Sequence, residues 1–582
     1  MGPMKYWSCL LLVCSGLAWA QETPPAAPAA SAEAAPEPMP RSALNGPLFY
    51  QLLLAELETR EGSAGAGFSL MLDAARKLKD AALFQRAVQM ALQARSGDAA
   101  LQAAQAWKKE RPQDIEPNRY LIQIQLALGR VADAGRSLEQ ALRDLPANEL
   151  PAAIASVPGL FGNVPDRALA LQAAEAALAP WLRQGELGSL AQVTLGRMQR
   201  DAGQIGAAVE SARRARNLDQ RHIEPLLLAM SLLRQAPEPM QALLDEAMKV
   251  GVPPSLQLSY ARQLVSLKQP EQALAQTQAL LIRHPMHAPA WLLMGLLQSD
   301  AGDRSEARQS LEYFVSLAQA SREPADREGL PEALILLSQI AQDNGRLDQA
   351  ERWLDQVPPE VDPIRLALRR ADVLALRGQL NEARNVLSAA RADTPELQQR
   401  KLLAQSFWLR EHGLAQEAYG LIKQALQSRP NQAELMIELS LLTEKLKRHD
   451  ETESVLRRLI EIQPNDAQAY NSLGYSLADR NIRLDEARQL IERAVALAPE
   501  DPFIQDSLAW VLYRQGQTEQ ALRVLQAAYA ARPDAEIAAH LGEVLWVRGQ
   551  TDEATRIWRE GARLNPRNET LLETWQRFGF RP

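Results

Sequence analysis

The side chains from which active sites and metal sites are usually built are sparse in this 582-residue sequence. His284 and His287 flank Pro285, but no third metal ligand lies near them, so they are predicted to be solvated turn residues. Acidic residues are abundant, yet no pair is set apart as an acid–base couple, and they fit the solvated faces of helices. The sequence also lacks the HExxH zinc motif, a phosphate-binding glycine loop and a serine nucleophile elbow. We therefore predict no catalytic, cofactor-binding or metal-binding residue and a protein that is not an enzyme.

The N-terminus carries the pattern of a secretory signal. Lys5 precedes an apolar run that ends in Ala18-Trp19-Ala20, so that small residues occupy the −3 and −1 positions before a cleavage site. The run has about fifteen residues and is too short to cross roughly 30 Å of hydrocarbon. Residues 1–20 are predicted to be a signal peptide that is cleaved after Ala20, which would place the mature protein in the periplasm.

Both cysteines of the chain, Cys9 and Cys14, lie inside this signal. Its removal would leave a mature chain without a thiol, and therefore without disulfides or thiolate metal sites. The alternative is a lipid anchor on Cys14. A lipoprotein signal needs a small residue just before the modified cysteine, and Val13 occupies that place.

The segment after the signal and the charge of the chain limit the partners further. Residues 21–40 contain six prolines with alanine and acidic residues but almost no large apolar side chain, so 21–45 is predicted to be a disordered linker. The chain has a net charge of −7 and no dense stripe of Lys or Arg. Binding to a nucleic-acid backbone is therefore not expected.

Prolines recur along the chain with a period near 34 residues. Such a period is the signature of a repeat architecture, in which each unit is one small supersecondary motif that buries its apolar face only by stacking on its neighbours. The prolines at this period are Pro112, Pro146 and Pro180, then Pro253 and Pro285, and then Pro395, Pro430, Pro464, Pro499, Pro533 and Pro566.

The residues before each proline repeat as well. Gly516, Ala521, Leu525 and Ala528 precede Pro533, and the same types stand at the same distances in other repeats. The glycine suits a turn that needs a positive φ, and the alanines suit the closest approach of two helices. The pattern resembles the tetratricopeptide repeat (TPR). It predicts an all-α TPR solenoid, a right-handed superhelix of about 13–14 helix hairpins.

The repeats divide the predicted mature chain into three parts. Residues 46–330 are expected to hold the N-terminal, less regular repeats, and residues 331–566 the regular C-terminal repeats. Residues 567–582 follow the last proline and supply several large apolar side chains, so they are predicted to form a capping helix.

The candidate binding residues lie in the last repeats, on the first helix of each hairpin. Stacked hairpins line a concave face with these helices, and aromatic and arginine side chains are common anchors of protein interfaces. For Trp510 and Trp546 the alternative is packing against neighbouring helices, and the sequence leaves both interpretations open. The predicted protein-binding residues are Asn471, Tyr475, Phe503, Asp506, Trp510, Tyr513, Arg514, Glu543 and Trp546.

Three segments near the C-terminus carry a closer resemblance: 471–480 (NSLGYSLADR), 506–516 (DSLAWVLYRQG) and 538–546 (AAHLGEVLW). They resemble the C-terminal repeats of Gram-negative periplasmic and outer-membrane TPR lipoproteins, typified by the protease adaptor LbcA. The resemblance implies an adaptor that brings a periplasmic carboxyl-terminal processing protease to cell-wall hydrolase substrates. The signal departs from that family because Val13 precedes Cys14.

The residues themselves indicate only a solenoid that binds proteins. The expected function is therefore an exported scaffold or adaptor, in the periplasm and associated with the outer membrane if Cys14 carries a lipid. The alternative is a scaffold for envelope assembly or for polysaccharide or pilus export machinery. In either case the partners are proteins, and nucleic acid is not among them.

Overall fold

A computed structural model describes residues 44–183 and 185–580. The predicted signal peptide with its cleavage site at Ala20, the lipidation candidate Cys14 and most of the predicted linker lie outside the described residues. Within the described ranges the regular structure is helical, without a strand. The chain divides into two compact units whose boundary in sequence lies between Gly251 and Val252.

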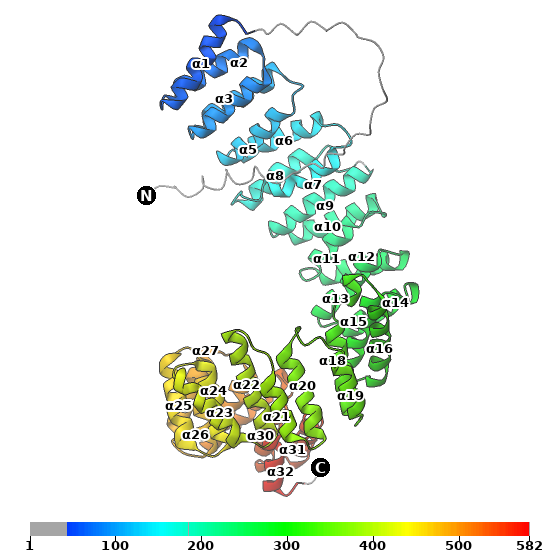
Figure 1. Cartoon of the computed structure of the whole chain (residues 1–582), viewed down its shortest axis with the longest axis vertical. Coiled ribbons are helices and arrows are strands. Elements are labelled where there is room, and N and C mark those ends of the chain that lie inside the picture. Colours follow the sequence, from blue (N-terminus) through cyan, green and yellow to red (C-terminus); the bar gives the residue numbers. More distant parts are fainter. Residues whose placement is uncertain (1–43, 184, 581–582) are drawn as a thin grey trace. The chain divides into compact units, whose positions relative to one another are not determined.

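The first unit is a stack of helices (Figure 1). Its helices are α1 (Gly46–Arg60), α2 (Ala64–Leu78), α3 (Ala81–Gln93), α4 (Gly97–Glu110), α5 (Glu116–Ala127), α6 (Val131–Asp144), α7 (Leu150–Leu160), α8 (Arg167–Leu178), α9 (Gly185–Asp201), α10 (Ile205–Leu218), α11 (Glu224–Leu232) and α12 (Pro237–Val250). Successive helices pack on one another, except that α6 packs on α8 more than on α7, and α7 packs mainly on α9.

The second unit continues the same construction. Its helices are α13 (Pro254–Ser266), α14 (Pro270–Arg283), α15 (Ala288–Asp300), α16 (Arg304–Ala320), α17 (Pro324–Arg327), α18 (Leu330–Asp343), α19 (Leu347–Leu354), α20 (Pro363–Leu376), α21 (Leu380–Ala389), α22 (Pro395–Glu411), α23 (Ala415–Ser428), α24 (Ala433–Lys445), α25 (His449–Ile462), α26 (Ala467–Asp479), α27 (Leu484–Leu497), α28 (Pro502–Arg514), α29 (Thr518–Ala531), α30 (Ala535–Val547), α31 (Thr551–Leu564) and α32 (Glu569–Phe578).

The hairpin of α28 and α29 shows how the repeat residues produce this geometry. The Asp501 side chain accepts a hydrogen bond from the amide of Phe503 (2.9 Å) and so caps the start of α28. Gly516 turns the chain between the two helices with a φ of +80°, which a residue with a Cβ adopts only at a cost. Ala521 and Leu525 are fully buried where α29 packs on its neighbours. Capping, turning and packing are thus supplied by residues at fixed places in the repeat.

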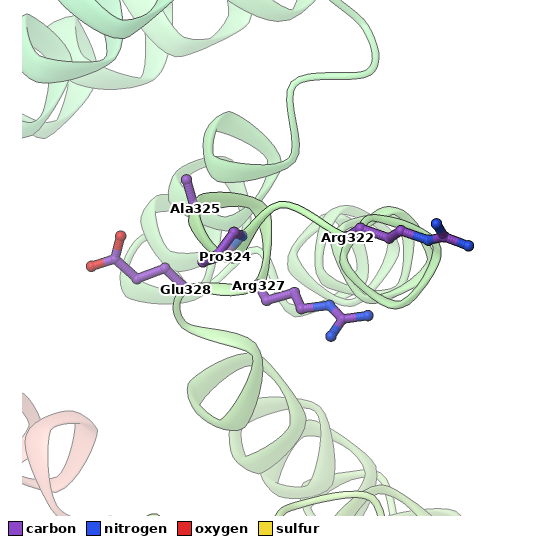
Figure 2. Close-up of a pocket in the computed structure, with 5 residues that line it drawn as sticks. All are labelled: Arg322, Pro324, Ala325, Arg327 and Glu328. Atoms are coloured by element: carbon purple, nitrogen blue, oxygen red, sulfur yellow. The ribbon is translucent and has the colours of Figure 1, made fainter. Parts of the chain in front are cut away.

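The stretch around residue 330, where the sequence separates two groups of repeats, lies within the second unit. It contains the single-turn helix α17, which is held locally: Ser321 donates a hydrogen bond to Asp326 (2.7 Å) and the Arg327 side chain donates one to the Ser321 carbonyl (2.9 Å). A surface hollow of about 560 Å³ lies beside it, and Figure 2 shows that the Arg322 and Glu328 side chains project outward on opposite sides. The hollow is lined by Arg322, Pro324, Ala325, Arg327 and Glu328.

The two ends of the described chain differ in how they finish the stack. The first helix, α1, leaves Phe49, Tyr50 and Leu53 exposed. At the other end α32 occupies the segment predicted to form a capping helix, and it buries Leu571 and Trp575 against the last hairpin. A terminal helix of this kind covers the apolar face that a stack of repeats would otherwise leave open.

Candidate protein-binding surface

The first helices of the hairpins form one face of the second unit. Helices α18, α20, α22 and α24 contact one another in succession, and so do α26, α28 and α30. The second helices α21, α23 and α25 have no comparable contacts with each other. The first helices therefore lie on the shorter, inner side of the stack, the side that repeat proteins use for binding. We call this side the inner face.

Two apolar side chains are exposed at equivalent places on the inner face. Phe407 of α22 is 52% exposed, and Leu441 of α24, 34 residues further along, is 45% exposed. Leu403 and Ile437 lie one turn earlier on the same two helices and are partly buried. We call Phe407 and Leu441 the apolar stripe.

The apolar stripe is not among the residues predicted from the sequence, which belong to the inner face of the last repeats only. A signal was present, since Phe407, Leu441, Tyr475 and Trp510 follow one another at intervals of 34 or 35 residues. The stripe thus belongs to the same register as two of the predicted binding residues.

Three of the nine predicted binding residues are buried rather than accessible: Asp506, Trp510 and Glu543. Trp510 is only 1% exposed because the His540 ring of α30 stacks on its indole, with ring centres 4.2 Å apart and planes 22° apart. The prediction that Trp510 offers an accessible surface is therefore wrong, and the packing alternative holds for this residue.

The other six predicted residues are partly buried and lie on or beside the inner face. The Tyr513 ring lies 5.3 Å from that of Trp510, and Arg514 donates a hydrogen bond to the Asp479 carbonyl (2.8 Å). Trp546 stacks on Trp558 at 5.4 Å. The six are Asn471, Tyr475, Phe503, Tyr513, Arg514 and Trp546.

A buried polar chain links three successive first helices. The His540 Nδ1–H donates to Asp506 Oδ2 at 2.8 Å, and the Tyr475 hydroxyl lies 3.4 Å from His540 Nε2. Burial lowers the pKa of His540, but the Asp506 carboxylate opposes this effect and the net shift is upward. An imidazolium–carboxylate pair inside the stack is the state that this geometry favours.

Carboxylates gather around Tyr475 from several helices. Burial raises the pKa of Tyr475 well above its usual value, and Glu536, Asp479, Asp506 and Glu444 raise it further. Burial also raises the pKa of the Glu536 carboxyl. This end of the inner face is therefore acidic.

The capping helix is joined to this region by an ion pair. Arg577 of α32 donates to the buried Glu543 carboxylate of α30 at 2.7 Å and to the Thr574 hydroxyl at 3.1 Å. Glu543 was predicted to contact a partner, but its carboxylate is already satisfied within the chain. The Glu543 carboxylate therefore holds α32 in place through Arg577 and is not accessible to a partner.

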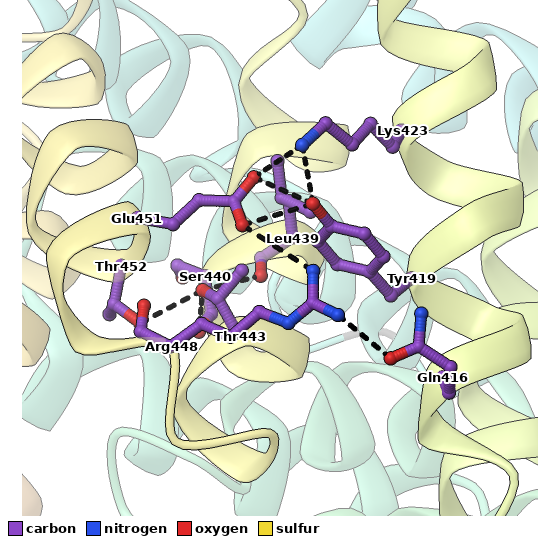
Figure 3. Close-up of polar contacts among 9 residues, drawn as sticks. All are labelled: Gln416, Tyr419, Lys423, Leu439, Ser440, Thr443, Arg448, Glu451 and Thr452. Atoms are coloured by element: carbon purple, nitrogen blue, oxygen red, sulfur yellow. Dashed lines mark hydrogen bonds and ion pairs between the residues drawn. The ribbon is translucent and has the colours of Figure 1, made fainter.

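A second polar cluster lies on α23 and α25, among the second helices (Figure 3). Glu451 accepts hydrogen bonds from the Tyr419 hydroxyl (2.9 Å) and from Lys423 (2.8 Å). The Arg448 guanidinium lies over the Tyr419 ring, 4.2 Å from its centre. The side chains satisfy one another, so the cluster ties adjacent hairpins together.

Neither a cluster of metal-ligating side chains nor a membrane-spanning helix occurs in the described ranges. No three or more His, Cys, Asp or Glu side chains in residues 44–183 and 185–580 are grouped as a metal site would require. In the same part of the chain, every helix is too short or too polar to cross a membrane.

Comparison with known proteins identifies the repeats. The tetratricopeptide repeat family matches residues 409–474 and 507–568. A TPR repeat-containing protein of Pseudomonas aeruginosa, PA4667, is 37% identical over 205 residues, which cover 35% of this chain and 35% of that protein. The protein O-mannosyl-transferase Tmtc1 of Drosophila melanogaster is 30% identical over 118 residues, covering 19% of this chain and 14% of that protein. The chain thus spans about a third or less of the length of these relatives.

Two solved structures that are similar to the chain are TPR proteins. One is TTC0263 of Thermus thermophilus, with 20% identity, a TM-score of 0.29 and coverage of 31% of this chain and 99% of that one. Another is a TPR protein of Parabacteroides merdae, with 17% identity, a TM-score of 0.33 and coverage of 42% and 98%. The stacked hairpins and the family matches confirm the predicted all-α TPR solenoid.

Proposed function

We propose that this protein is a non-catalytic scaffold that binds other proteins through the inner face of its C-terminal repeats. The observation that carries the proposal is the apolar stripe, where Phe407 and Leu441 stand exposed at equivalent places on adjacent helices. Single exposed apolar side chains are common on proteins, but aligned ones on a concave repeat surface are typical of an interface.

The stripe supplies the kind of energy that a protein interface needs. Apolar surface withdrawn from water contributes about 25 cal/mol per Å², and a few central anchors usually carry most of the binding energy. Phe407 and Leu441 lie on helices that are held by packing, so little backbone entropy is lost when a partner covers them. A partner segment laid across α22 and α24 would contact both.

Replacing both stripe residues should weaken binding strongly. We expect Phe407→Ser with Leu441→Ser to raise the Kd for a partner at least about a hundredfold, since anchors contribute about 2 kcal/mol each and 1.4 kcal/mol is tenfold. The partner is first captured from envelope extract by a photo-crosslinker placed at position 441, and its affinity for the full chain is then measured with purified components.

The matched control is Ile282→Ser with Leu564→Ser. These residues are also exposed, Ile282 by 77%, but they lie on the second helices α14 and α31. The control variant should bind as the wild type does. Equal binding by the stripe variant and the wild type would refute the inner face as the binding surface.

The finer assignment is an adaptor that couples a periplasmic carboxyl-terminal processing protease to cell-wall hydrolase substrates. The motifs at 471–480, 506–516 and 538–546 support it by resemblance. The test is the rate at which such a protease cleaves a wall hydrolase with and without this protein. An unchanged rate, together with capture of polysaccharide or pilus export components, would favour a scaffold for envelope assembly instead.

This assignment requires export. We expect the purified native protein to begin at Gln21, because Ala18 and Ala20 fit the small pockets of a signal peptidase. Mass spectrometry of the intact protein measures the N-terminus directly. A diacylated N-terminal Cys14 would replace this cleavage site with a lipid anchor, and a retained residue 1–20 segment would count against export.

A further inference from the structure

The apolar stripe leads directly into the acidic end of the inner face. Leu441 and Glu444 lie three residues apart on α24, so both side chains point to the same side of the helix. Glu444 accepts a hydrogen bond from the Ser476 hydroxyl of α26 at 2.9 Å, next to Tyr475. An exposed apolar side chain and a carboxylate are thus neighbours on the surface that a partner would contact.

Two carboxylates in this region form no ion pair within the described chain. Asp506 is paired with His540, and Glu444 lies 3.3 Å from His449 Nδ1. Asp479 of α26 is exposed and Glu536 of α30 is partly buried, and neither forms an ion pair among residues 44–183 and 185–580. Their carboxyl groups remain available to pair with a cationic ligand.

The nearby arginines and lysine are directed elsewhere. Arg480 and Arg514 donate to the main-chain carbonyls of Ser476 and Asp479 (3.0 and 2.8 Å). Lys445 pairs with Glu569 of α32 at 2.8 Å. Arg480 and Arg514 keep their positive charges, since carbonyls are neutral, but the hydrogen bonds direct these two guanidinium groups at the main chain. Within the described part of the chain, Asp479 and Glu536 therefore remain without an ion pair on the inner face between α24 and α30.

We propose that the inner face binds an extended protein segment in which an apolar side chain is accompanied by Lys or Arg. The apolar side chain would cover Phe407 and Leu441, and the cation would lie against Glu444, Asp479 and Glu536. This inference rests on the proposed function and adds the chemistry of the partner. Charge complementarity selects such a segment, since an acidic one would meet the same carboxylates with like charge.

Labelled peptides of ten residues test the proposal on the full chain. One contains alternating Leu and Arg, the second has Gln in place of Arg, and the third has Glu in place of Arg. We expect the Arg peptide to bind at least tenfold more tightly than the Gln peptide, and the Glu peptide more weakly than both. The advantage of the Arg peptide should shrink as salt screens the charges.

A variant identifies the carboxylates responsible. Asp479→Asn with Glu536→Gln should reduce the affinity for the Arg peptide about tenfold and leave the Gln peptide unchanged. The matched control, Asp450→Asn with Glu461→Gln, removes two exposed carboxylates from the second helix α25 and should change neither. Circular dichroism melting checks that each variant remains folded.

The outcomes separate this inference from the proposed function. Equal affinity for the Arg, Gln and Glu peptides, or an Arg-peptide affinity that the Asp479 and Glu536 substitutions do not change, would overturn the basic–apolar partner. The proposed function would survive that result if a partner still required Phe407 and Leu441. If partner binding did not depend on Phe407 and Leu441, both the proposed function and this inference would be overturned.

Discussion

Truncation of Trp510 to alanine should destabilise the C-terminal hairpins by about 3–5 kcal/mol, the usual cost of removing a large buried aromatic side chain. The indole is 1% exposed and packs against His540, Tyr513 and the cluster that includes Leu477 and Val511. Its Nε1 has no hydrogen-bond partner in the described structure, so the truncation removes packing and the contact with the Arg514 guanidinium, which lies 5.6 Å from the ring centre. A cavity between α26, α28 and α30 would remain.

Hydrogen exchange is the appropriate measurement because a long repeat stack does not unfold in a single step. Protection should fall in α26, α28 and α30 and persist in α20 and α22, since repeats are coupled mainly to their neighbours. Phe407→Ala is the control, because this aromatic residue is half-exposed and its loss should cost much less stability than the loss of Trp510. Unchanged protection in Trp510→Ala combined with lost partner binding would make Trp510 an anchor after all.

Removal of the Asp506 carboxylate should have a similar effect. Asp506→Ala is expected to cost about 3–5 kcal/mol, since it leaves the 1%-exposed His540 without its partner in the interior. The double variant Asp506→Ala with His540→Leu should recover part of this loss, because it removes both polar groups. If the double variant were no more stable than Asp506→Ala alone, the stabilising effect of Asp506 would not come from its pairing with His540.

The same pair should make stability depend on pH. The pKa of His540 is raised above its ordinary value of 6.5, so the charged pair stabilises the fold fully below pH 6.5 and loses this contribution as pH rises through the folded-state pKa. The raised pKa of Glu536 acts in the same direction, because its ionisation above pH 4.5 is disfavoured in the folded state. Protection in α28 and α30 should therefore decline above pH 6.5, and His540→Gln should remove most of that decline.

The repeat residues determined the fold because their effects are local. A glycine that permits a positive φ, a small side chain at the closest helix contact and a proline that ends a helix act within one hairpin. This is illustrated by Gly516, Ala521 and Pro533. In the structure Gly516 has a φ of +80°, and Ala521 is completely buried. Repetition of these residues at a period near 34 then predicts stacked hairpins without knowledge of any long-range contact.

Exposure on the inner face was decided only by the tertiary structure. Phe407 and Trp510 hold equivalent places in their repeats, yet one is exposed and the other is buried. The cause lies on the first helix of the following hairpin. His540 of α30 stacks over Trp510, whereas the equivalent residue of α24, Glu438, accepts hydrogen bonds from Ser406 and Arg410 (2.8 and 3.0 Å). Among the described residues, no ring from α24 covers Phe407, which has only the Arg410 guanidinium over it (5.4 Å) and stays half-exposed. The sequence determined which residues face the inner side of the stack. Which of these residues a partner can reach depends on the side-chain contacts between neighbouring hairpins, because the repeat pattern does not encode those contacts.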